Sequence, residues 1–95
     1  ILRNHVDAYF SLENNIAASG MRVLSSPVGH DPRVISGESG AVGMGLLYAL
    51  LNNHKEIARE AKLDANSVIL LFSTEGATDE ENYRDIVWHG KYPYL

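Results

Sequence analysis

The chain carries one short pattern twice, and this repetition restricts the folds that it can adopt. Residues 34–42 read VISGESGAV, and residues 68–78 read VILLFSTEGAT. Each segment begins with an apolar run, continues with a serine and a glutamate, and reaches Gly-Ala ahead of a helical pattern. This order predicts a strand, a turn and a helix, and we call each such strand–turn–helix junction a corner. Open α/β sheets bind ligands at the carboxyl ends of their strands, so we expect both corners to face one crevice.

Apolar periodicity predicts four helices. We expect them over residues 12–24, 39–51, 54–63 and 80–88. The first should have Ser11 as its N-cap and an interruption near Gly20, and the last should have Asp79 as its N-cap.

Two apolar segments, residues 33–36 and 67–72, are predicted to be strands. The second is apolar without alternation, which is typical of a strand covered on both faces. A helical connection would make the two strands parallel. The predicted fold class is therefore α/β, in the order helix, strand, helix, helix, strand, helix. Two strands form a poor sheet, and the chain starts at Ile1 rather than Met. We therefore expect residues 1–95 to be one segment of a larger protein.

Composition excludes several classes of function. The 95 residues are 45% hydrophobic and 21% charged, with a net charge of −4. There is no basic patch, so a nucleic-acid partner is not expected. Cysteine is absent, which excludes disulfides and thiolate metal sites. No apolar run is long enough to span a bilayer, so no membrane partner is expected and a cytoplasmic location is the default. The four histidines lack metal-ligand spacing, so no metal site is predicted.

The first corner is rich in glycine, with Gly37, Gly40 and Gly43 at intervals of three. Glycines inside a helix cost roughly 1–3 kcal/mol together, relative to alanine. Tight packing of the helix on a sheet explains that cost, and so does the close approach of a ligand. Glu38 has two explanations as well, since it can interact with the helix dipole or line a ligand site.

The second corner offers hydroxyl groups in the same place. Ser73 and Thr74 can cap the turn or hydrogen-bond a ligand ring, and Glu75 can be a cap or a site acid. The recurrence at both corners favours a ligand site. Lys55 and Lys62 lie on a polar helix face, and no lysine has the apolar setting that Schiff-base chemistry requires. No catalytic residue is therefore predicted in this segment.

The stretch from Gly20 to Gly90 resembles the C-terminal part of the diaminopropionate ammonia-lyases. The resemblance rests on GMRVLSSP, DPRVISGESGAVG and FSTEGATDEENYRDIVWHG. These enzymes use pyridoxal phosphate and have the fold of the tryptophan synthase β group, called fold type II. Glu80 departs from the family, which often places proline there. The resemblance implies α,β-elimination of 2,3-diaminopropionate to pyruvate and ammonia. It also implies a small amino-acid substrate and a homodimeric full-length enzyme.

The resemblance also implies roles for particular residues. The pyridine nitrogen of the cofactor would face the hydroxyl of Ser73 or Thr74. Glu38 would form a wall beside the ring, and Gly37 and Ser39 would allow close approach. The family carries its Schiff-base lysine, its phosphate cup and its acid and base groups upstream. The segment alone is therefore expected to be inactive.

Two other interpretations stay open. The chain could come from another fold type II enzyme, such as one similar to threonine dehydratase. It could also be a small α/β binding or regulatory module without chemistry, in which the glycines serve packing and Glu38 and Glu75 serve as helix caps. If the chain is a truncated segment, its sheet would expose an apolar edge, so we expect an oligomer or a swapped assembly.

Overall fold

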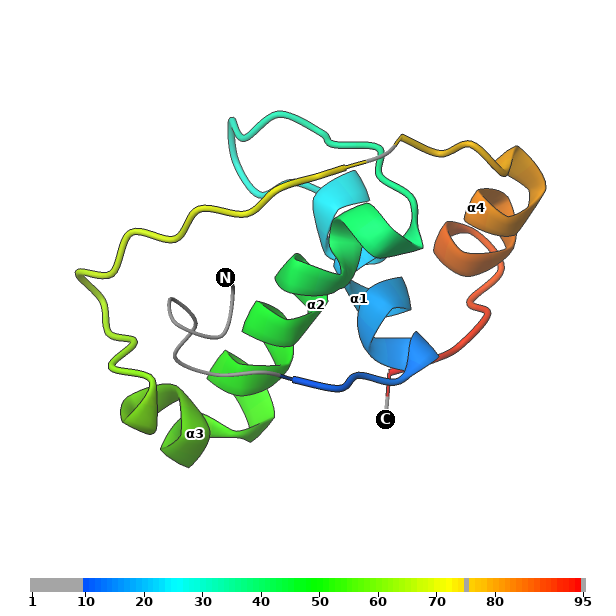
Figure 1. Cartoon of the computed structure of the whole chain (residues 1–95). Helices are drawn as coiled ribbons and strands as arrows, with labels where there is room; N and C mark the ends of the chain where they lie inside the picture. The colour runs from blue at the N-terminus through cyan, green and yellow to red at the C-terminus, as the bar shows by residue number, and fades with distance from the viewer. Residues whose placement is uncertain (1–9, 75, 95) are drawn as a thin grey trace, which may run out of the picture.

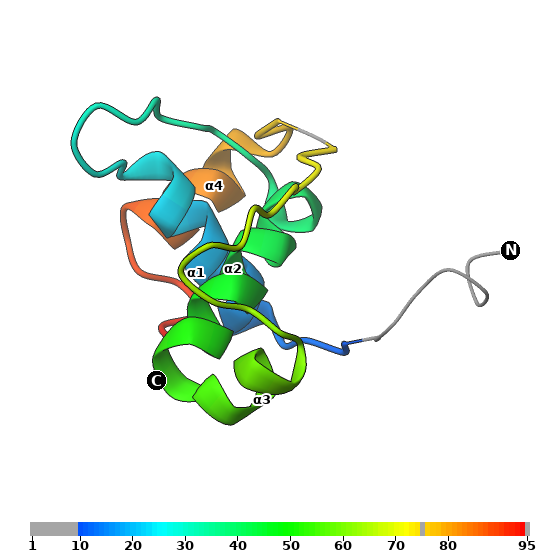
Figure 2. The same cartoon turned by 90° about the vertical axis from the view of Figure 1, so that its left-hand side faces the viewer.

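Four helices form the part of the chain that the computed structural model describes, residues 10–74 and 76–94. They are α1 (Asn14–Ser25), α2 (Glu38–Asn53), α3 (Lys55–Glu60) and α4 (Glu80–Val87). Helices α1 and α2 pack side by side, and α3 and α4 lie at opposite ends of this pair (Figure 1). The turned view keeps the same arrangement (Figure 2). The helices follow the predicted order, and none within these ranges is long and apolar enough to cross a bilayer.

The details of the helix ends differ from the sequence predictions at α1. Its N-cap is Glu13, without a side-chain cap hydrogen bond, instead of Ser11. The predicted interruption near Gly20 is wrong, because α1 continues through that residue. Asp79 is the N-cap of α4 as predicted, and its Oδ1 accepts a hydrogen bond from the backbone N–H of Asn82 at 3.0 Å.

The predicted strands are not borne out in the described residues, which contain no β-strand. Residues 67–72 run as an extended chain along the helices (Figure 1), and residues 33–36 are also irregular. A strand exists only through hydrogen bonds to a neighbouring strand, and no such ladder forms here. One face of the apolar run accordingly lacks cover: Val68 is 98% exposed and Phe72 is 77% exposed, whereas Leu71 is 38% exposed. Of the predicted α/β fold, the described residues therefore contain the four helices and neither strand.

Glycines allow the backbones of α1 and α2 to touch. A Cβ added at Gly20 would overlap the carbonyl oxygen of Ala41 and lie 2.7 Å from the nitrogen of Gly45. A Cβ added at Gly45 would overlap the carbonyl oxygen of Ile16. These two glycines therefore allow close packing of helix on helix.

The core is small and joins three helices. Its buried side chains are Ala18 and Met21 of α1, Ala41 of α2 and Ile86 of α4. Partly buried apolar side chains surround this cluster: Leu24, Tyr83, Val87 and Tyr92. Since Ile86 is fully buried, it fixes α4 against the α1–α2 pair and sets the position of the α4 N-terminus.

Arg22 holds the segment that follows α4. Its Nε donates a hydrogen bond to the carbonyl of Ile86 at 3.0 Å, and one terminal nitrogen donates to the carbonyls of Lys91 and Tyr92. The last carbonyls of a helix lack partners within the helix, and a cation near them is favourable. Burial lowers the pKa of the Arg22 guanidinium from its ordinary value. We call these three hydrogen bonds the Arg22 clasp.

Candidate functional site

The two corners of the repeated pattern meet in space. Ser36 Oγ and Ser73 Oγ lie 3.0 Å apart and share a hydrogen bond across 37 positions of sequence. Ser36 is completely buried, while Ser73 is exposed. The two corners, which were predicted to face one crevice, therefore lie in contact, although neither of the segments before them is a strand.

Local hydrogen bonds fix the first corner against α1 and α2. The backbone N–H of Val34 donates to the carbonyl of Leu24 at 2.9 Å, which ties this segment to the end of α1. Gly37 is the N-cap of α2 in an extended conformation, and its carbonyl accepts from the N–H of Ala41 at 3.1 Å. Glu38 is therefore the first residue of α2, where the positive end of the helix dipole favours a carboxylate.

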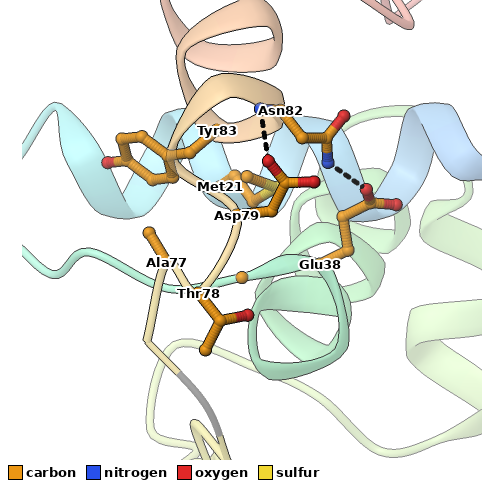
Figure 3. Close-up of a pocket in the computed structure, with 8 residues that line it drawn as sticks. Met21, Glu38, Ala77, Thr78, Asp79, Asn82 and Tyr83 are labelled. Carbon is orange, nitrogen blue, oxygen red and sulfur yellow. Dashed lines mark hydrogen bonds between the residues drawn. The ribbon is translucent and has the colours of Figure 1, made fainter.

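Glu38 is also held from α4. The side-chain Nδ2 of Asn82 donates a hydrogen bond to Glu38 Oε1 at 2.7 Å. Figure 3 shows the Asn82 amide reaching from α4 to the Glu38 carboxylate, with Asp79 beside them. These groups border a pocket of about 230 Å³ between the N-termini of α2 and α4. Its lining residues are Met21, Gly37, Glu38, Ala77, Thr78, Asp79, Asn82 and Tyr83.

The structure separates the predicted site residues into two groups. Gly37 and Glu38 line the pocket. Ser39, Ser73 and Thr74 do not line it and are exposed, although Ser73 joins the same corner through Ser36. The prediction for Glu75 concerns a residue outside the described ranges.

Sequence reasoning missed Asn82 as a site residue and assigned Asp79 only a capping role. Asn82 lies 44 positions from Glu38, and an amide on a short helix has no pattern that distinguishes it from a solvated side chain. Thr78 ends the second copy of the repeated pattern, so its place in the pocket could have been suspected from that repetition.

The chemistry of the pocket favours an uncharged or cationic polar group. Among the described residues, two carboxylates, an amide and two hydroxyl groups line it, and none of these lining residues is basic. A phosphate would find no cationic partner among these residues. The described residues also contain no group of three or more side chains suited to hold a metal ion.

Known proteins match the chain along most of its length. No family model matches it. The diaminopropionate ammonia-lyase of Escherichia coli (strain K12) is 47% identical over 94 residues, which are 97% of this chain and 24% of that protein. The diaminopropionate ammonia-lyase of Salmonella typhimurium (strain LT2) is 46% identical over 96% of this chain and 23% of its own length. The chain thus spans about a quarter of the length of these relatives.

Solved structures of the Escherichia coli enzyme have the same fold in the matched part. The complex with an aminoacrylate–PLP azomethine reaction intermediate has a TM-score of 0.78 and 48% identity, over 83% of this chain and 21% of that one. The apo form has a TM-score of 0.80 and 48% identity, over 84% of this chain and 23% of that one. The resemblance that the two corner motifs predicted is therefore confirmed. Over the length that it covers, the chain is homologous to diaminopropionate ammonia-lyase.

Proposed function

We propose that this chain is the C-terminal segment of a pyridoxal-phosphate-dependent diaminopropionate ammonia-lyase. The full-length protein would carry out α,β-elimination of 2,3-diaminopropionate to pyruvate and ammonia. The observation that carries the proposal is the 47% identity over 97% of the chain to enzymes of that name. The segment alone is expected to be inactive, because the sequence offers no lysine in a setting suited to Schiff-base chemistry.

The residues at the two corners would hold the pyridine ring of the cofactor. Ser73 is exposed and tied to Ser36, and a hydroxyl group can donate one hydrogen bond and accept two. Ser73 or Thr74 would accept or donate at the ring nitrogen. Glu38 would stand beside the ring, with Gly37 and Ser39 leaving space for it. The bound cofactor would supply the electron sink, while these residues orient and enclose it.

The finer features of the full-length protein are part of the same proposal. Residues 33–36 and 67–72 would be parallel strands of a fold type II large domain, since residues 67–72 are largely apolar and expose one face. The full-length protein would be a cytoplasmic homodimer that binds a small amino acid and no nucleic acid. The acidic net charge of −4 supports the last point.

The test uses the full-length protein. Its visible absorbance is recorded before and after addition of 2,3-diaminopropionate, and pyruvate is assayed. A cofactor band that changes with substrate, together with pyruvate, is the expected result. A cofactor band without pyruvate from this substrate, but with turnover of threonine, would move the protein to the dehydratases. A colourless protein would contradict the enzyme interpretation and favour a module without chemistry.

Two substitutions test the corner residues. Ser73→Ala and Thr74→Ala should alter the cofactor band or reduce turnover, and the larger effect identifies the residue that faces the ring nitrogen. The matched control is Ser26→Ala, which removes the hydroxyl of an exposed serine just after α1. Corner variants that behave like Ser26→Ala would contradict the assignment of these hydroxyl groups.

A further inference from the structure

The side chain of Asn82 lies between two opposite charges. Its Nδ2 donates to Glu38 Oε1 at 2.7 Å, and its Oδ1 accepts from Lys91 Nζ at 3.2 Å. A carboxylate only accepts hydrogen bonds and an ammonium only donates them. The amide therefore has one chemically sensible orientation, with its nitrogen toward Glu38 and its oxygen toward Lys91.

The backbone of Asn82 is fixed as well. Its N–H donates to the N-cap carboxylate of Asp79 at 3.0 Å, so Asn82 lies in the capped first turn of α4. One turn further along, Ile86 is buried in the core and its carbonyl belongs to the Arg22 clasp. The amide thus projects from an anchored helix, and this makes it suitable for holding another side chain in place.

Glu38 depends on this amide for its orientation. Among residues 10–74 and 76–94, Asn82 is its hydrogen-bond partner, and it engages only Oε1. A carboxylate has about four acceptor positions on its two oxygens. The contact with Asn82 therefore restricts the rotation of the carboxylate (Figure 3), and it uses only one of the accepting positions of a side chain that lines the pocket.

We propose that Asn82 is a positioning residue that orients Glu38 against the cofactor ring. This inference rests on the proposed function, because it requires a cofactor beside Glu38. Lys91 completes the arrangement by holding the amide oxygen, so that the amide cannot rotate away from the carboxylate. Without the amide, the Glu38 carboxylate should remain in the pocket but should be free to rotate.

The experiment is a double-mutant cycle in the full-length protein, with Asn82→Ala, Glu38→Ala and the double variant. The absorbance maximum and the dissociation constant of the bound cofactor are measured, together with the unfolding midpoint without cofactor. Asn82→Ala should weaken cofactor binding by about tenfold and shift the absorbance maximum in the same direction as Glu38→Ala. The double variant should show no further change in either quantity. Glu81→Ala, an exposed position of the same helix, is the matched control.

Asn82→Asp is the second variant, in case Asn82→Ala folds poorly. It keeps the size of the side chain and an oxygen for Lys91, but it faces Glu38 with a second carboxylate. It should therefore shift the cofactor band at least as far as Asn82→Ala. If both variants lower only the unfolding midpoint and keep the normal band and affinity, Asn82 is a structural contact and the inference is overturned. If the unsubstituted protein shows no cofactor band, the proposed function fails and this inference falls with it.

Discussion

Gly45 has the most specific steric requirement among the residues of α2. A Cβ at this position would overlap the carbonyl oxygen of Ile16 in α1. In an open helix Gly→Ala is stabilising by about 0.5–1 kcal/mol. Here Gly45→Ala should instead destabilise the protein by about 1–3 kcal/mol, because the helices must move apart. Urea denaturation measures the change in the free energy of unfolding.

Gly43 is the matched control for that prediction, since it lies in the same helix. A Cβ at Gly43 would meet Cδ2 of Leu71 at 3.1 Å, which is the end of a flexible side chain. Gly43→Ala should therefore leave the free energy of unfolding within about 1 kcal/mol of the original. Equal losses from both substitutions would contradict the helix-on-helix explanation.

Arg22 gives a second prediction for a single residue. Arg22→Lys should destabilise the protein by about 1–3 kcal/mol, because carbonyls of the clasp lose their hydrogen-bond donors. One ammonium group cannot replace the planar guanidinium, which donates from two nitrogens at once. The lowered pKa of the guanidinium means that burial penalises its charged form. That penalty is constant wherever the group stays protonated, so Arg22 should add no pH dependence to stability in the neutral range. Denaturation of both proteins at several pH values checks both points, and a cost that varies with pH in this range would count against the assignment.

The sequence predicted the places of some individual residues at the two corners. The repeated pattern placed Ser36, Glu38 and Ser73 at equivalent corners, and the structure brings Ser36 and Ser73 into contact. It could not identify Asn82, because the contact with Glu38 depends on how α4 docks on α1. That docking is set by packing of Ile86, which no local pattern encodes.

At the scale of elements, the start of α4 is the clearest case in which neighbouring residues determine where a helix begins. Asp79 accepts a hydrogen bond from the N–H of Asn82, and Glu80 and Glu81 occupy the first turn. Asp79→Ala should cost about 1 kcal/mol of stability, whereas Asp79→Ser should retain most of it. Thermal unfolding of the two variants measures this difference. A loss of equal size in both would show that the carboxylate acts through something other than capping.

Helices and strands differed in how far sequence could predict them, for a physical reason. The hydrogen bonds of α2 and α4 close within the segment, so periodicity and caps suffice to locate them. A strand needs a partner elsewhere in the protein. Residues 67–72 carry the composition of a buried strand, yet in the described part of the chain they have no ladder, and Leu70 is 77% exposed.

At the scale of the whole molecule, the exposed face of the apolar segment at residues 68–72 predicts association. Extended apolar backbone with open hydrogen-bonding groups readily pairs with another chain. The 95-residue chain should therefore form oligomers, and gel filtration with light scattering should show them. Leu70→Lys should reduce association, because a charge at an exposed edge opposes pairing. A monomer at all concentrations before any substitution would contradict this expectation.

The Arg22 clasp has a consequence for the speed of folding. Its hydrogen bonds join residues that are 64–70 positions apart, and closing a loop of that length costs roughly 4 kcal/mol in chain entropy. Contacts of this range form late, after the local helices. Arg22→Ala should consequently accelerate unfolding and leave the folding rate nearly unchanged. The clasp would then set how long the native chain persists once it has folded.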